Sequence, residues 1–166
     1  MKKIFVIVLV CAMLFLFSGC DNSKYFEDIE DYNEVWELSG YGAKEDGALP
    51  IFPSEIKDLD VIEFYCKYKE KLPLGEEIQV YLQVRYDDSE AFENEKERLI
   101  TVARSCDELF DNTDLSAFCV QSGEGYMWEY SLADDIKSEI YYIFVKDIPK
   151  SEILFDSKLL PKEYDY

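Results

Sequence analysis

The side chains most able to do chemistry in this sequence are carboxylates that stand next to each other. Examples are Glu76-Glu77, Asp87-Asp88, Asp107-Glu108 and Asp134-Asp135. Glycosidase-type hydrolysis needs two carboxylates that face one cleft with their pKa values pushed apart. In a chain with 36 acidic residues, adjacent pairs also arise by chance, and most of these fall at expected turns or helix ends. A carboxylate-dependent hydrolase is therefore kept as the alternative function.

Other catalytic and metal-binding patterns are missing or incomplete. The chain contains no histidine, which excludes Ser-His-Asp and Cys-His catalysis in their usual forms and histidine-ligated zinc or copper. Gly123 and Gly125 lack the spacing of a phosphate-binding loop. The stretch Asp107–Asp114 could offer oxygens to calcium, but it lacks the EF-hand order, so a polar turn is favoured. We expect no catalytic residue, no cofactor and no metal site.

The amino terminus has the layout of a secretory signal peptide. Lys2 and Lys3 precede an unbroken apolar run, Ile4 to Phe17, and small residues follow it. A membrane-spanning helix needs about 20 apolar residues, so this run is too short to be one. Export from the cytoplasm is therefore predicted.

The stretch Phe17-Ser18-Gly19-Cys20 resembles the lipobox of bacterial lipoproteins. Phe17 departs from the family pattern, in which an aliphatic residue is usual. The resemblance implies cleavage between Gly19 and Cys20 and a diacylglyceryl group on the Cys20 thiol. Because two acyl chains hold a protein stably on a bilayer, the lipid on Cys20 would anchor the chain to the extracytoplasmic face of the cell membrane. In general style, the rest of the chain resembles small lipoproteins of clostridia and related bacteria, which implies no activity.

The exported chain is strongly acidic. All 36 acidic residues follow Gly19, whereas Lys2 and Lys3 precede it, so 15 of the 17 basic residues remain and the net charge is −21. This charge argues against nucleic acid as a partner and against a domain lying flat on anionic headgroups. Cations, cationic peptides and basic protein surfaces remain as attracted partners, and solubility alone is the simpler explanation.

Three cysteines follow Cys20 in the exported chain: Cys66, Cys106 and Cys119. An odd number excludes a complete disulfide framework, although one bond among the three remains open in an extracytoplasmic setting. Cys66 and Cys119 stand in apolar surroundings, which favours buried thiols for both.

We expect residues 1–19 to be the signal peptide, 20–24 the lipidated cysteine and tether, and 25–166 a single α+β domain. Apolar residues at steps of three and four predict a helix over 25–38, and residues 39–53 predict a loop. A second helix is predicted to begin near Asp88 and to end around Asp107–Asp111, with Phe92, Leu99, Ala103 and Cys106 as its buried stripe.

Period-two alternation predicts a hairpin of two strands, 62–69 and 78–86. Further strands are expected at 117–121, 126–132 and 139–145, with a turn at 122–125 and a short last strand at 153–155. The sum is an antiparallel sheet of about five strands with one main helix on one face and an N-terminal helix. The face formed by Tyr126, Trp128, Tyr130 and Leu132 is expected to pack under the main helix.

The second face of the first hairpin is predicted to meet solvent, and it gathers basic residues beside tyrosines. Tyrosine and arginine are favoured at interfaces, so this is the possible interaction face, although cross-strand pairs on an open sheet explain the same pattern. Its residues are Tyr65, Lys67, Lys69, Tyr81, Gln83 and Arg85. The sequence thus predicts a lipid-anchored binding or interaction module, with the membrane and an envelope protein as partners.

Overall fold

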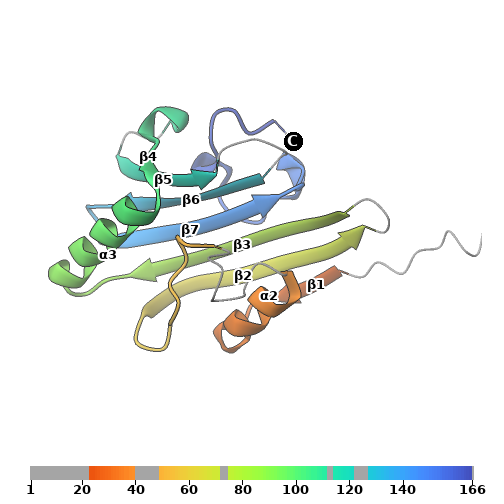
Figure 1. The fold of residues 1–166 in the computed structure, drawn as a ribbon, viewed down its shortest axis with the longest axis horizontal. Helices are drawn as coiled ribbons and strands as arrows, with labels where there is room; N and C mark the ends of the chain where they lie inside the picture. Colours follow the sequence, from red (N-terminus) through yellow and green to blue (C-terminus); the bar gives the residue numbers. More distant parts are fainter. Residues whose placement is uncertain (1–22, 40–48, 72–74, 112–113, 122–126, 166) are drawn as a thin grey trace, which may run out of the picture.

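The computed structural model describes residues 23–39, 49–71, 75–111, 114–121 and 127–165. Its frame is one seven-stranded sheet in the order β1-β2-β3-β7-β6-β5-β4, in which every neighbouring pair is antiparallel (Figure 1). The strands are β1 Ser23–Phe26, β2 Asp60–Lys71, β3 Gly75–Arg85, β4 Arg104–Ser105, β5 Leu115–Gln121, β6 Met127–Asp134 and β7 Glu139–Lys146.

The predicted fold class, about five strands with a main helix and an N-terminal helix, is wrong. The protein is mostly a sheet of seven strands. Part of the region predicted to be an N-terminal helix is β1, because Phe26 pairs with Cys66 of β2. A 3-10 turn η1 (Ile29–Asp31) and a short helix α2 (Tyr32–Ser39) follow it. The seventh strand is the two-residue β4, where a continuation of the main helix was predicted.

The first hairpin is confirmed. β2 and β3 pair over most of their length, with Tyr65 opposite Tyr81 and Lys67 opposite Gln79. The alternation of apolar and polar residues predicted this strand pair correctly, because a period of two places one set of side chains on each face of the sheet. The predicted strands 117–121, 126–132 and 139–145 fall within or overlap β5, β6 and β7. The predicted turn at 122–125 and most of the loop 39–53 lie outside the described residues.

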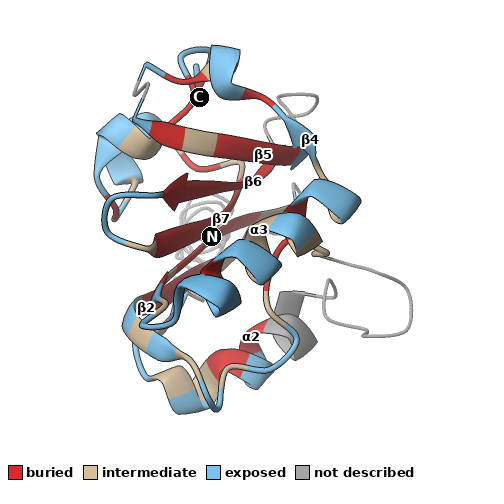
Figure 2. Cartoon of the chain, turned by 90° about the vertical axis from the view of Figure 1, so that its left-hand side faces the viewer, coloured by how far each residue is buried: buried red, intermediate tan, exposed pale blue. Residues whose placement is uncertain are grey.

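One face of the sheet is covered by helices and by the 49–59 segment (Figures 1 and 2). The longer helix is α3, Ser89–Val102, and it begins at Asp88, whose carboxylate accepts the Glu90 N–H. Phe92 and Leu99 of α3 pack on this face beside Ile51, whereas the predicted helix stripe continued to Cys106. The helix ends earlier because Ala103 is already extended.

The opposite face is covered by the C-terminal segment, residues 147–165. This segment contains the 3-10 turns η3 (Lys150–Glu152) and η4 (Ser157–Leu159), and no strand forms at 153–155. Phe155, Leu160 and Tyr164 pack against Tyr81 and against β6 and β7. Trp128, Tyr130 and Leu132 belong to this second core, so the prediction that they pack under the main helix is wrong.

Both faces of the sheet are therefore buried, and Figure 2 shows the strands as a predominantly buried layer. The predicted open solvent face of an antiparallel sheet does not exist over β3, β6 and β7. In the described part of the chain, no helix is long and apolar enough to cross a membrane.

Candidate functional site

The six residues of the predicted interaction face lie together on one face of β2 and β3, but this face is not the solvent-exposed surface that the pattern indicated. Tyr65, Lys67 and Tyr81 are buried, and Arg85 alone of the six is exposed. Tyr81 is stacked between Tyr65 and Phe155, with ring centroids 5.1 Å and 5.5 Å apart. The tyrosines therefore stabilise the C-terminal segment, and the tyrosine part of the predicted interaction face is an internal contact.

The polar residues of the same face are bound to acidic or backbone partners. The Lys67 ammonium lies 2.7 Å from Glu152, and this pairing lowers the pKa of Glu152. The amide of Gln79 donates to the Glu152 carbonyl at 3.0 Å and accepts the Leu154 N–H at 2.9 Å. Lys69 is half-buried. The basic residues thus have structural partners close at hand.

Gln83 and Arg85 meet at the buried carboxylate of Glu139. The Arg85 guanidinium lies 2.8 Å from one carboxylate oxygen, and the Gln83 amide donates to the other at 2.9 Å. Burial alone would raise the pKa of Glu139, but the hydrogen bonds from Arg85 and Gln83 outweigh it and lower the pKa. This cluster joins β3 to β7.

The paired carboxylates hold strand ends, turns and helix ends. Glu76 binds Lys146 at 2.8 Å, and Glu77 binds Lys71. Asp88 caps α3, Asp107 accepts the Ala117 N–H, and Asp134 accepts two N–H groups of its own turn. Within the described ranges, no group of three or more His, Cys, Asp or Glu side chains is placed to hold a metal ion.

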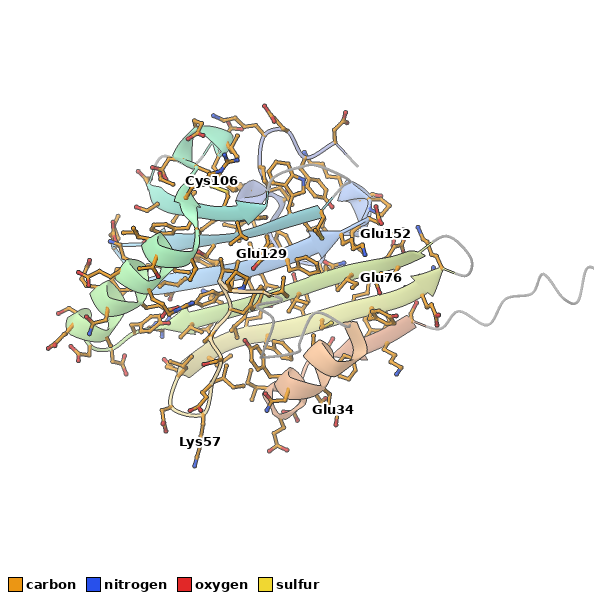
Figure 3. The ribbon with its side chains drawn as sticks, viewed as in Figure 1. Glu34, Lys57, Glu76, Cys106, Glu129 and Glu152 are labelled. Carbon is orange, nitrogen blue, oxygen red and sulfur yellow. A yellow bond between two sulfur atoms is a disulfide. The ribbon has the colours of Figure 1, made fainter. Side chains whose placement is uncertain are left out.

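Glu129 is an acidic side chain that the sequence reading missed. It lies on the helix-covered face of β6, near the middle of the sheet (Figure 3), where it accepts a long hydrogen bond of 3.5 Å from the Ile51 N–H. Burial raises the pKa of its carboxyl to about 7. Next on the same face, the hydroxyl of Ser131 is buried without a partner in the described structure. A lone carboxyl of this kind makes stability depend on pH.

An open groove of about 500 Å³ lies at the β1–β2 edge of the sheet. It forms because β1 pairs with Cys66–Lys69 and ends at Phe26, so β1 covers only part of the β2 edge. The chain then turns away through η1, which leaves the Val61–Phe64 part of β2 beside the turn. The lining residues are Glu27, Asp28, Ile29, Val61, Ile62, Glu63 and Phe64.

The groove combines acidic and apolar groups. Glu27, Asp28 and Glu63 are exposed, and no lysine or arginine belongs to the described lining. Ile62 is 40% exposed, at a bulge in the β2–β3 pairing. Sequence reasoning missed this place because it depends on where β1 stops along β2. The nearest sequence signal was Ile62 and Glu63 at the start of the first predicted strand.

Gly19 and Cys20, the predicted cleavage and lipidation residues, lie outside the described residues. The sequence left open one disulfide among the three later cysteines. Cys106 and Cys119 form this bond, and Cys66 is a buried free thiol. The prediction that Cys119 is a buried free thiol is therefore wrong. The bond ties the segment after α3 to β5, beside β4.

The fold and the groove define a seven-stranded antiparallel sheet protein with two buried faces and one acidic edge groove. Comparison with protein-family models, curated proteins and solved structures gave no match.

Proposed function

We propose that this is a lipid-anchored extracytoplasmic protein whose domain is a binding or interaction module at the cell envelope. The signal peptide 1–19 would be removed, and the lipid on Cys20 would hold the protein to the outer face of the cell membrane. The observation that carries the binding role is the open groove at the β2 edge. The carboxylate pairs are used in ion pairs and caps, which favours binding over hydrolysis.

The Cys106–Cys119 disulfide supports the exported location. Structural disulfides persist in oxidising compartments and are rare in the cytosol. This bond is independent of the amino-terminal motif, because it joins residues at the far side of the sheet from β1. Two separate features of the chain thus agree on export.

The position of β1 supports an end-on arrangement on the membrane. Ser23 begins β1 three residues after Cys20, so about 11 Å of extended chain at most separates their Cα atoms. Ser23 pairs with Lys69, which puts the turn end of the β2–β3 hairpin nearest the bilayer. Figure 3 shows Glu76 and Glu152 at this end of the sheet.

The net charge at that end of the sheet suits an anionic bilayer surface better than the net charge of the rest of the chain does. Among the described residues at that end, six lysines stand against five acidic residues, whereas the exported chain carries −21 overall. The lysines are Lys24, Lys67, Lys69, Lys71, Lys146 and Lys150, and the acidic residues are Glu70, Glu76, Glu77, Asp147 and Glu152. Anionic headgroups would repel this end least.

Anchoring is tested by replacing the lipidated thiol. In cells that export the full-length protein, Cys20→Ala should leave it in the soluble fraction or as an uncleaved precursor, whereas Cys11→Ala, within the apolar run, should change neither. Cell fractionation measures where the protein is, and its intact mass shows whether the signal peptide has been removed. A Cys20→Ala protein that remains in membranes with the mass of the normally cleaved chain would contradict the proposal.

A further inference from the structure

We propose that the β2-edge groove binds an extended, basic segment of a partner protein by strand addition. This inference rests on the proposed function, because it names the class of partner that the interaction module would take. Strand addition uses an exposed sheet edge for main-chain hydrogen bonds and neighbouring pockets for alternate side chains. Both parts are present at this edge.

The available edge is the part of β2 that β1 does not reach. β1 pairs with residues 66–69 of β2, and in the described chain no strand pairs with the outer edge of Val61–Tyr65. A segment entering the groove would continue the line of β1 along the same strand. It would thereby extend a sheet that the protein has already built.

Charge selects the partner. Glu27, Asp28 and Glu63 surround the groove, and their fields add to that of a chain carrying −21. A segment with lysine or arginine at alternate positions would meet these carboxylates, whereas acidic segments would be repelled. The same repulsion opposes a second copy of this chain, since acidic side chains on an edge strand are a common means of blocking edge-to-edge pairing.

Apolar side chains of the segment have a place between the acids. Ile62 is 40% exposed, and Ile29 and Val61 are partly exposed in the same groove. In a strand, alternate residues point to opposite sides, so a segment that alternates basic and apolar residues matches both kinds of lining. The groove lies about 23 Å along β2 from the Lys69 end, counting seven residues from Lys69 to Ile62. That distance keeps it clear of the proposed membrane surface.

Binding is tested with three fluorescent peptides on the full-length protein, purified in non-ionic detergent. The first alternates lysine and valine over seven residues, the second has proline in place of the central valine, and the third has glutamate in place of lysine. Anisotropy should show saturable binding of the first peptide, at least tenfold weaker binding of the second, and none of the third. Raising the salt concentration from 50 to 300 mM should weaken the binding of the first peptide roughly tenfold.

Variants locate the site. The double variant Glu27→Gln/Glu63→Gln should bind the lysine-valine peptide about tenfold more weakly, and Ile62→Lys should have the same effect. All three side chains are exposed, so their replacement leaves the core intact. Glu97→Gln, an exposed acid on α3 outside the groove, is the matched control and should leave the affinity unchanged. Hydrogen exchange should show new protection at residues 61–65 when the peptide binds.

Any of three results with the peptides would overturn the inference. They are equal binding of the proline peptide, equal affinity in the groove variants and in Glu97→Gln, or no saturable binding up to millimolar peptide. Sedimentation provides a further test. If the wild-type protein self-associates and Ile62→Lys does not, a second copy of the chain occupies the groove, which would also overturn the inference. The intact mass of the same sample reports the lipid on Cys20, so failure of the peptide test is distinguishable from failure of the anchoring proposal.

Discussion

The side-chain oxygen of Gln79 accepts the backbone N–H of Leu154 over 2.9 Å, from the centre of a buried strand to a segment without regular structure. The same amide donates to the carbonyl of Glu152. One side chain therefore replaces the two main-chain hydrogen bonds that a neighbouring strand would supply. Gln79 is fully buried, so while the segment covers it no water can take over either hydrogen bond of its amide.

Gln79→Leu should lower the free energy of unfolding by about 1–3 kcal/mol, because it removes both hydrogen bonds and leaves backbone groups of the C-terminal segment unpaired. Hydrogen exchange should become faster at residues 152–155 before the rest of the sheet. Gln83→Leu is the control, since Gln83 hydrogen-bonds to the side chains of Tyr81 and Glu139 and not to the backbone of that segment. If exchange at 152–155 rises equally in both variants, Gln79 does not hold the segment.

The failure to predict this covered face has a physical origin. Alternation in 62–69 and 78–86 identified the hairpin, because the apolar set Phe64, Val80 and Leu82 is buried on the helix side. Tyrosine and glutamine in the alternate positions were interpreted as solvent-facing. Their cover, Phe155 and its neighbours, lies far away in the sequence, and no periodic pattern marks it.

The edges of the sheet were equally hard to predict. Phe26 and Ile29 fit a helical spacing, yet Phe26 is held in β1 by its pairing with Cys66. β4 has two residues, too few for any period to be visible. The groove follows from the point at which β1 ends, so it too depended on contacts between distant segments. The sequence shows the carboxylates Glu27 and Glu63, but it does not show that they lie in the same groove.

Cys106 and Cys119 are separated by 13 positions in the sequence. A disulfide that closes a loop of this size contributes about 3 kcal/mol to the free energy of unfolding. The double variant Cys106→Ala/Cys119→Ala should unfold at lower denaturant, and a reductant should destabilise the wild-type protein without affecting the double variant. Cys66→Ala removes the buried free thiol and should keep its sensitivity to the reductant. Reductant sensitivity that persists in the double variant would show that another pairing forms.

Arg98 fastens the 49–52 segment to α3. Its guanidinium donates to the carbonyls of Pro50 and Ile51 at 2.7 Å and 2.5 Å and pairs with Glu95. Arg98→Lys should lower the free energy of unfolding by about 1–3 kcal/mol, because a single ammonium cannot reproduce this planar set of donors. Chemical denaturation measures the change, and Lys96→Arg on the same helix is the control. An Arg98→Lys protein as stable as the wild type would mean that packing of Ile51 alone holds the segment.

Glu129 should make the protein more stable in mild acid than at neutral pH. Its carboxyl has a pKa of about 7 in the folded protein, raised by burial, against 4.5 when unburied. Between these values the folded state binds more protons than the unfolded state, so stability falls as the pH rises from about 4.5 to 7 and then levels off. The loss is on the order of 3–4 kcal/mol, because the pKa rises by about 2.5 units and each unit corresponds to about 1.4 kcal/mol.

No histidine contributes in this range, because the chain has none. Glu139 and Glu152 act in the opposite direction at lower pH: their pKa values are lowered in the fold, so the stability they contribute is lost as the pH falls through those values. Maximum stability is therefore expected near pH 5. Urea denaturation of Glu129→Gln should give a nearly flat profile between pH 5 and 8 and a protein more stable than the wild type at pH 8. The exposed Glu63→Gln should retain the wild-type slope, and a Glu129→Gln protein that also retains it would assign the pH dependence to the general repulsion among acidic groups.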